Sequence, residues 1–201
     1  MMRLVLATGN EGKAREFRSL LPASFDIVTS TSIGLAIPEE TGSTFDENAR
    51  IKAVAVSLLI PDLVVADDSG LVVDALGGRP GVRSARYAGE PTDDDANIQL
   101  LLDELQETAA NDRAARFVCT LCLARDGDVL ALVEGHVGGW IASRRRGTSG
   151  FGYDPVFMNV DGRSMAELTP LEKNAISHRG AALRRLIPVL MRYAHELGES
   201  R

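Results

Sequence analysis

The sequence predicts an α/β protein built on a mixed β-sheet. In the first half of the chain, short apolar runs typical of strands alternate with segments whose apolar residues recur at helical spacing. Further along, two strand-like runs are separated only by a short turn containing Asp126 and Gly127, which predicts a hairpin. Alternating strands and helices favour parallel pairs, and a hairpin adds an antiparallel pair, so we expect a mixed sheet flanked by helices.

Length and charge limit the possibilities further. The 201 residues predict a single domain spanning residues 1–201, because two ordinary domains need a longer chain. A net charge of −6 argues against long nucleic acid as a partner, since duplex-binding proteins are usually basic. The chain shows no signal-peptide pattern and no membrane-spanning apolar stretch, so we expect a cytoplasmic protein that does not associate with membranes.

The first part of the chain predicts two strands and two helices. Residues 3–7, apolar after Arg3, indicate a buried strand, and a helical pattern follows the glycine-containing loop 8–13. A second strand is expected at residues 26–29. Thr44 and Glu47 have the spacing of a capping box, in which each side chain bonds the other residue's backbone N–H, so a second helix should begin there.

The middle of the chain predicts a short strand, a turn and a helix. Residues 63–66 read as a buried strand, and we expect residues 67–70 to form a loop at its carboxyl end. The glycines and proline of residues 77–81 indicate a turn. A helix should begin near residues 92–95, because the apolar residues that follow share one helical face: Ile98, Leu101, Leu102 and Leu105.

The last part of the chain predicts the hairpin and the C-terminal helices. Its strands are expected at residues 116–124 and 129–135, and a basic loop follows at residues 144–150. Thr169 and Glu172 form a second capping box, with a proline at the first helical position. Pro188 lies inside the apolar pattern of the last helix and predicts a kink or a break.

Paired carboxylates give the first candidate site. Asp67 and Asp68 follow a buried strand, where charged carboxylates are costly unless a cation or solvent meets them. Magnesium commonly binds one or two carboxylates together with substrate phosphates. Glu39 and Glu40, in another loop, could complete such a site. The alternative is an ordinary turn in a solvated loop.

Basic and glycine-rich segments give the second candidate site. The loop 8–13 opens a helix, so its backbone N–H groups could bind an anion, and Lys13 would add positive charge. It is not a Walker A loop, because the glycine spacing fails and Ala14 replaces the hydroxyl residue. Lys52 lies one helical turn from Asn48. An ordinary turn and a solvated lysine remain the alternatives.

Aromatic residues and hydrogen-bond donors in the last third of the chain give the third candidate site. Phe151 beside Gly152 could stack on a nucleotide base, although simple core packing explains the pair as well. Lys173 should share a face with Ser177 on the helix that starts at Thr169. His178 and Arg179 follow with several hydrogen-bond donors, although a lone histidine is more often structural.

Two further motifs are better explained without chemistry. Cys119 and Cys122 have the spacing of a redox or zinc motif, but in a strand these positions point to opposite faces. The chain has no second cysteine pair for a structural zinc site. We expect reduced thiols with no metal. The arginines at residues 144–146 could contact phosphate, but a charge run usually forms a solvated loop.

Motif blocks along nearly the whole chain resemble those of one family. They include Leu6-Ala7-Thr8-Gly9-Asn10, Glu39-Glu40-Thr41-Gly42, Ala66-Asp67-Asp68-Ser69-Gly70-Leu71, Gly150-Phe151-Gly152-Tyr153-Asp154-Pro155 and Ser177-His178-Arg179-Gly180. In this order they resemble the inosine triphosphate pyrophosphatase family, also called HAM1-like. The resemblance implies an elongated fold of two lobes with an active-site cleft between them, and a homodimer. It also implies magnesium-dependent hydrolysis of the deaminated purine nucleotides ITP, dITP and XTP to a nucleoside monophosphate and pyrophosphate, which clears them from the nucleotide pool.

The resemblance also implies roles for individual residues. Asp68 matches the general base and a metal ligand, and Glu39 matches the other metal-binding carboxylate. The positions on the triphosphate side are Thr8, Gly9, Asn10, Glu11, Gly12, Lys13, Lys52 and Ser69. Those on the base side are Phe151, Gly152, Tyr153, Asp154, Lys173, His178 and Arg179. Donors aimed at a purine 6-keto oxygen would disfavour adenine, which carries an amino group there.

Two other function classes remain open from the sequence. One is a phosphatase that forms an aspartyl-phosphate on Asp67 or Asp68, although that class carries Asp-x-Asp and here the two are adjacent. It would release orthophosphate. The other is a non-catalytic nucleotide-binding module, which would not need the acidic residues and would bind without turnover.

Overall fold

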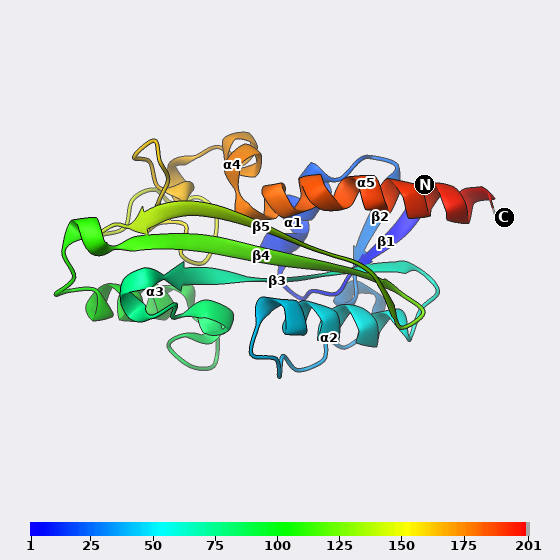
Figure 1. Ribbon diagram of the computed structural model, residues 1–201, viewed down its shortest axis with the longest axis horizontal. Helices are drawn as coiled ribbons and strands as arrows, with labels where there is room; N and C mark the ends of the chain where they lie inside the picture. Colours follow the sequence, from blue (N-terminus) through cyan, green and yellow to red (C-terminus); the bar gives the residue numbers. More distant parts are fainter. Residues whose placement is uncertain (200–201) are drawn as a thin grey trace. The chain divides into compact units, whose positions relative to one another are not determined.

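The computed structural model describes residues 1–199 and contains one mixed six-stranded sheet. Its strand order is β2-β1-β3-β4-β5-β6. β1 pairs in parallel with both β2 and β3, whereas β5 and β6 are antiparallel. The predicted α/β class with a mixed sheet is therefore confirmed (Figure 1). The strands are β1 (Met2–Leu6), β2 (Phe25–Thr29), β3 (Leu63–Val73), β4 (Ala114–Arg125), β5 (Asp128–Ile141) and β6 (Phe157–Met158).

The helices begin at the capping residues that the sequence indicates. The Thr44 hydroxyl accepts from the Glu47 backbone N–H, but the Glu47 carboxylate bonds Ser43 rather than completing a reciprocal box. Thr169 and Glu172 form both halves of theirs. The helices are α1 (Glu11–Leu20), α2 (Phe45–Ser57), α3 (Asp94–Glu104), α4 (Pro170–Ile176) and α5 (His178–Glu199).

The chain forms two compact units, each assembled from separate segments. Unit 1 contains Met1–Asp68, Cys119–Gly135 and the chain from Arg179 onward. Unit 2 contains Ser69–Val118 and His136–His178. The strands β3, β4 and β5 each contribute residues to both units. The single domain expected over residues 1–201 stays a prediction.

In unit 1, helices cover both faces of the sheet (Figure 1). Leu4 and Leu6 of β1 pack in one apolar cluster with residues of α1 and α5, while Val5 packs on the opposite face in a cluster with α2. The same alternation along β4 places Cys119 in the first cluster and Cys122 in the second. Both are free thiols, and the prediction that they point to opposite faces is confirmed.

In unit 2, one apolar cluster packs α3 against the sheet. Ile98 and Leu101 of α3, and Leu105 directly after it, are buried beside Leu71 of β3 and Phe157 of β6. The predicted helical face is thus confirmed, with Leu102 only partly buried at its margin. This cluster supports the segment that carries the base-side candidates.

The structure confirms the predicted hairpin turn but places β3 differently from the prediction. The hairpin turn is confirmed: Asp126 and Gly127 both have positive φ angles, 51° and 86°, as a tight two-residue connection requires. β3, however, continues through residues 67–70, so the expectation of a loop there is wrong. Buried cationic partners satisfy Asp67 and Asp68, and the apolar residues 71–73 then extend the strand.

The C-terminal helices also differ from expectation. Ser177 has extended backbone angles and ends α4, so α4 and α5 are separate helices. α5 runs through Pro188, so the break is not observed. Leu183, Leu186 and Leu190 on either side of it are buried in the core, and this packing holds the helix together across the missing hydrogen bond.

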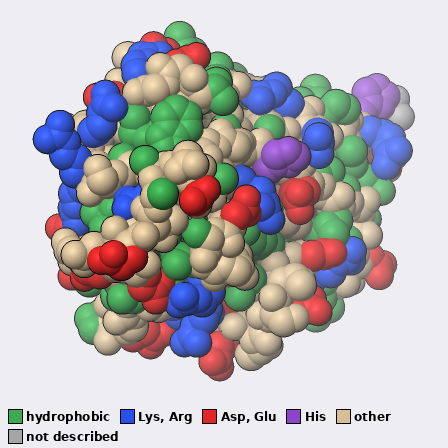
Figure 2. Space-filling model, turned by 60° about the vertical axis from the view of Figure 1, so that its left-hand side comes forward, with side chains coloured by type: hydrophobic (Ala, Val, Ile, Leu, Met, Phe, Trp, Pro, Cys, Tyr) green, Lys and Arg blue, Asp and Glu red, His purple; other side chains and the backbone are tan. Residues whose placement is uncertain are grey.

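The surface carries charges of both signs. On the face drawn in Figure 2, Lys and Arg side chains gather beside hydrophobic ones at the upper left, and Asp and Glu side chains are more frequent below them. Within the described residues, no helix combines the length and apolarity needed to cross a membrane.

Candidate active site

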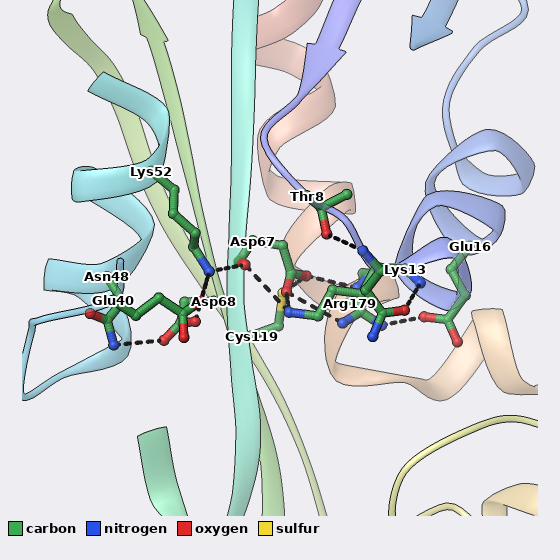
Figure 3. A network of polar contacts seen from close by, with 11 residues as sticks. Thr8, Lys13, Glu16, Glu40, Asn48, Lys52, Asp67, Asp68, Cys119 and Arg179 are labelled. Atoms are coloured by element: carbon green, nitrogen blue, oxygen red, sulfur yellow. Dashed lines mark hydrogen bonds and ion pairs between the residues drawn. The ribbon is translucent and has the colours of Figure 1, made fainter. Parts of the chain in front are cut away.

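Asp67 and Asp68 occupy adjacent positions in the middle of β3 and therefore point to opposite sides of the strand (Figure 3). Both are buried, with 3% and 4% of their surface exposed. Two carboxylates in such positions need cationic partners or hydrogen-bond donors, and each side of β3 supplies its own set.

The Asp67 carboxylate is held by three side chains from three elements. Lys13 of α1 forms an ion pair with it, the Arg179 Nε donates to its Oδ2 at 2.7 Å, and the Cys119 thiol of β4 donates to the same oxygen at 3.1 Å. Burial acts to raise the pKa of Asp67, but the charges of Arg179 and Lys13 outweigh it and hold the pKa well below the ordinary value. Asp67 is therefore an anion whose oxygens are already engaged.

Arg179 lies at the start of α5 and is 1% exposed. Its guanidinium bonds both Asp67 and Glu16 of α1. This arrangement joins α1, β3 and α5 inside unit 1 (Figure 3). The sequence-based assignment of Arg179 to the purine base stays a prediction, but both of these ion pairs join it to carboxylates of its own unit.

The Asp68 carboxylate faces α2. Lys52 donates to its Oδ1 at 2.9 Å, and the Asn48 amide donates to its Oδ2 at 3.3 Å. Lys52 also donates to the Asp67 backbone oxygen at 2.9 Å and pairs with Glu40. Asn48 accepts from the Gly42 backbone N–H at 2.8 Å, so it connects the loop before α2 with Asp68.

The electrostatic balance at Asp68 is suited to proton transfer. Burial, with help from the nearby negative charge of Glu40, raises the pKa of Asp68 to about 6, against the opposing charge of Lys52. Burial lowers the pKa of Lys52, but Asp68 and Glu40 outweigh that effect and raise it, so Lys52 stays charged. A carboxylate with a pKa close to neutral pH can accept a proton and release it again.

A cation would fit beside Asp68. Glu40 brings a second carboxylate to Lys52, and one lysine does not balance two carboxylates. The described residues contain no cluster of three or more His, Cys, Asp or Glu side chains arranged to hold a metal. Magnesium is compatible with fewer protein ligands, since it keeps waters and binds substrate phosphates. The adjacent Glu39, assigned as the metal ligand from the resemblance, is exposed; Glu40 is the one that contacts Lys52.

The loop before α1 has the expected form. Thr8 is buried and accepts from the Asn10 backbone N–H at 3.1 Å, and the Asn10 side chain caps α1 by accepting from the Lys13 N–H at 3.0 Å. Gly9, Asn10 and Glu11 are exposed. The start of a helix with exposed backbone is a suitable place for an anion.

In unit 2, Asp154 organises the base-side candidates. Its Oδ2 accepts from the Phe151 backbone N–H at 3.0 Å, and it forms a buried ion pair with Lys173. The Lys173 ammonium lies over the Phe151 ring, 4.8 Å from its centroid. Gly150 has φ 84°, and a Cβ there would collide with Asp154. The arrangement holds Phe151, which is only partly buried, in one orientation.

The other base-side candidates make hydrogen bonds and packing contacts with neighbouring parts of the fold. Tyr153 is buried, and its hydroxyl donates to the Ser84 carbonyl at 2.9 Å, while the Gly152 N–H donates to Asp94. His178 is 7% exposed and stacks on Phe117 with ring centroids 4.8 Å apart. Ser69, assigned to the triphosphate side, is partly buried in β3.

Sequence reasoning missed two members of the Asp67 network. Glu16 lies three residues after Lys13 and so on the same face of α1, which was an available signal. For Cys119, the only signal in the sequence was its spacing to Cys122, which is that of a redox or zinc motif and gives no indication of a contact with Asp67. Its contact with Asp67 depends on the pairing of β4 with β3, which no local pattern predicts.

Comparisons with known proteins agree with this architecture. A model of the Ham1 family matches residues 4–189. A Bacillus subtilis protein named dITP/XTP pyrophosphatase is 50% identical over 193 residues, covering 94% of this chain and 98% of that protein. The solved structure of a HAM1 protein from Coxiella burnetii has a TM-score of 0.85 at 42% identity, covering 96% of this chain and 100% of that one. The Staphylococcus aureus Ham1 structure has a TM-score of 0.82 at 41% identity, over 95% of this chain and 99% of that one. The chain belongs to the Ham1 family.

Proposed function

We propose that this protein hydrolyses the nucleoside triphosphates of deaminated purines, ITP, dITP and XTP, to a nucleoside monophosphate and pyrophosphate. The observation that carries the proposal is the buried Asp68, held by Lys52 and Asn48, with its pKa raised to about 6. A relative 50% identical to this chain bears the name dITP/XTP pyrophosphatase. Removal of these nucleotides would keep deaminated bases out of the nucleotide pool.

Asp68 acts as the general base in this proposal. Its carboxylate accepts a proton from the water that attacks the α-phosphate, and Asn48 and Lys52 fix its orientation. Lys52, which stays charged, is suited to stabilise the negative charge that develops as pyrophosphate leaves. Lys13 and the exposed backbone at the start of α1 bind the phosphates, together with Thr8, Gly9, Asn10, Glu11, Gly12 and Ser69.

The proposal includes a magnesium ion held by Asp68 and a carboxylate of the residue 39–40 pair. When bound, the ion would acidify the attacking water and offset phosphate charge. The hard oxygen donors beside Lys52 support this choice of metal. The contacts of Glu40 make it a second candidate ligand next to Glu39.

The purine is recognised by the residues that Asp154 organises. Phe151 offers a ring for stacking, and Lys173, anchored by Asp154, offers a charged donor at its face. Gly152, Tyr153, His178 and Arg179 complete the set proposed from the resemblance. We further propose that the whole chain acts as one pyrophosphatase domain, in the cytoplasm, as a homodimer, without nucleic-acid or membrane partners.

A product analysis tests the reaction. ITP, dITP, XTP, GTP and ATP should be incubated separately with the protein and Mg²⁺, and both products identified by anion-exchange chromatography. We expect a nucleoside monophosphate and pyrophosphate in equal amounts, formed faster from ITP, dITP and XTP than from ATP. Orthophosphate as the first product would instead favour an aspartyl-phosphate mechanism, and saturable binding without turnover would favour a binding module.

Removal of the metal should slow this reaction but not unfold the protein. After treatment with EDTA, we expect the rate of pyrophosphate release from ITP to fall at least about tenfold, because charge stabilisation by a metal is lost. Some rate should persist because Lys13 and Lys52 stay in place. Restoring Mg²⁺ should restore the rate. An unchanged rate in the metal-free protein would remove the metal from the proposal.

A further inference from the structure

Unit 2 contains a pocket whose lining includes none of the residues assigned to the proposed reaction. It has a volume of about 370 Å³ and lies at the end of β5, beside the loop that follows and the turn after β6. The side chains that give it its chemistry are Trp140, Met158 and three arginines, Arg113, Arg144 and Arg146. Among the described residues, no Asp or Glu lines it. In a chain of net charge −6, this is a local reversal of charge.

The three arginines differ in how far they are already engaged. Arg113 is buried and donates to the backbone oxygens of Leu105 and Thr108. Arg146 reaches Glu167 only at 3.4 Å. Arg144 is exposed and makes no hydrogen bond or ion pair with any residue that the structure describes. Arg144 thus keeps its full set of donors, which in a guanidinium match the oxygens of a phosphate group.

Trp140 supplies the aromatic part of the same pocket. It pairs with Met158 across the β5–β6 ladder and leaves 36% of its surface exposed. A tryptophan held in a strand beside arginines is a suitable surface for stacking a nucleotide base, because every base has a flat π face. It is also the only tryptophan in the chain.

We propose that this pocket binds a nucleoside monophosphate, with the base on Trp140 and the phosphate on Arg144 and Arg146. The volume suits one nucleotide, and the available donors suit one phosphate group. The pocket lacks a carboxylate that could act as a base, so it binds its ligand without hydrolysing it. The site is separate from the residues of the proposed reaction. The same chemistry occurs at the end of a single-stranded nucleic acid, which the negative net charge disfavours.

The single tryptophan makes the proposal directly measurable. AMP should be titrated into the full-length protein in EDTA-containing buffer while Trp140 fluorescence is recorded. We expect saturable quenching. Arg144→Ala should raise the apparent Kd at least about tenfold, the usual scale for losing hydrogen bonds from a charged group. The neighbouring Arg145→Ala is the matched control, because Arg145 is engaged by Asp95 and does not line the pocket. Its Kd should stay within about twofold of the parent.

Several results would overturn the proposal. One is the absence of saturable quenching, and another is the same Kd in Arg144→Ala as in the parent protein. Quenching by an eight-nucleotide single strand but not by AMP would show that nucleic acid, not a mononucleotide, is the ligand. The rate of ITP hydrolysis with Mg²⁺ should be unaffected by either substitution. This rate separates the two proposals, since the pocket can fail its test while the proposed hydrolysis stands.

Discussion

Asp68→Asn should lower kcat for ITP at least about 100-fold, the scale of lost general-base catalysis. The amide keeps the size of the side chain and can still accept from Asn48 or Lys52, but it cannot take a proton from water. KM should change much less, because Lys13 and the start of α1 remain to bind the phosphates. The measurement is the initial rate of pyrophosphate release from ITP with Mg²⁺ over a range of substrate concentrations.

The fold should survive this substitution. Lys52 keeps its partners at Glu40 and at the Asp67 backbone oxygen, so no buried cation is left alone. Asp46→Asn on α2 is the matched control, since it makes the same chemical change at a carboxylate whose side chain is about half exposed and pairs only with Arg50 one turn away. That variant should keep kcat within about twofold. An Asp68→Asn protein that folds and keeps a kcat within about threefold of the parent would remove Asp68 from the role of base.

The parts of the fold that were predictable depend on local pattern. The helix starts at Thr44 and Thr169 follow from side chains that bond nearby backbone N–H groups, and the hairpin follows from residues that tolerate positive φ. Alternation of side chains in β4 was enough to separate Cys119 from Cys122. Each of these features is decided within a few residues of sequence.

The features that were not predictable depend on partners far away in the chain. Asp67 and Asp68 read as a loop because two carboxylates are unfavourable inside a strand. They lie in β3 because Lys52, Lys13 and Arg179 come from α2, α1 and α5 to meet them. Distances along the sequence of up to 112 residues separate these partners. The arrangement of the site therefore depends on contacts between distant parts of the chain, whereas the helix starts and the hairpin depend on local sequence.

Arg179 illustrates the difference most clearly. The sequence shows Arg179 only as a residue with several hydrogen-bond donors next to His178, and the resemblance assigns both residues to the purine base. In the structure it is buried between Asp67 and Glu16, where its pKa is raised, since the two negative charges outweigh the burial that acts to lower it. The two roles predict different consequences of the same substitution, so a single variant can separate them.

Arg179→Met should destabilise the fold by about 3–5 kcal/mol, the scale of breaking a buried ion pair by removing one partner. Methionine fills much of the space but leaves Asp67 buried with Lys13 as its remaining cation. The measurement is the free energy of unfolding in urea. Arg184→Ala on the exposed face of α5 is the control and should stay within about 0.5 kcal/mol of the parent. If Arg179→Met is too unstable to study, Arg179→Lys keeps the charge while losing the paired hydrogen bonds.

A second substitution at Asp67 distinguishes a structural network from a purine contact. If the loss in Arg179→Met comes from a buried Asp67 carboxylate that keeps only Lys13 as a cationic partner, adding Asp67→Asn should recover part of it, and the two changes should be non-additive. The ratio of kcat/KM for ITP over that for ATP should then stay near the parent value in every folded variant, because both nucleotides depend equally on the fold. Additive losses, together with a fall in the ratio of kcat/KM for ITP over that for ATP, would contradict the network. They would support a contact between Arg179 and the purine base, because a lost hydrogen bond from a charged donor is expected to affect a 6-keto purine more than adenine.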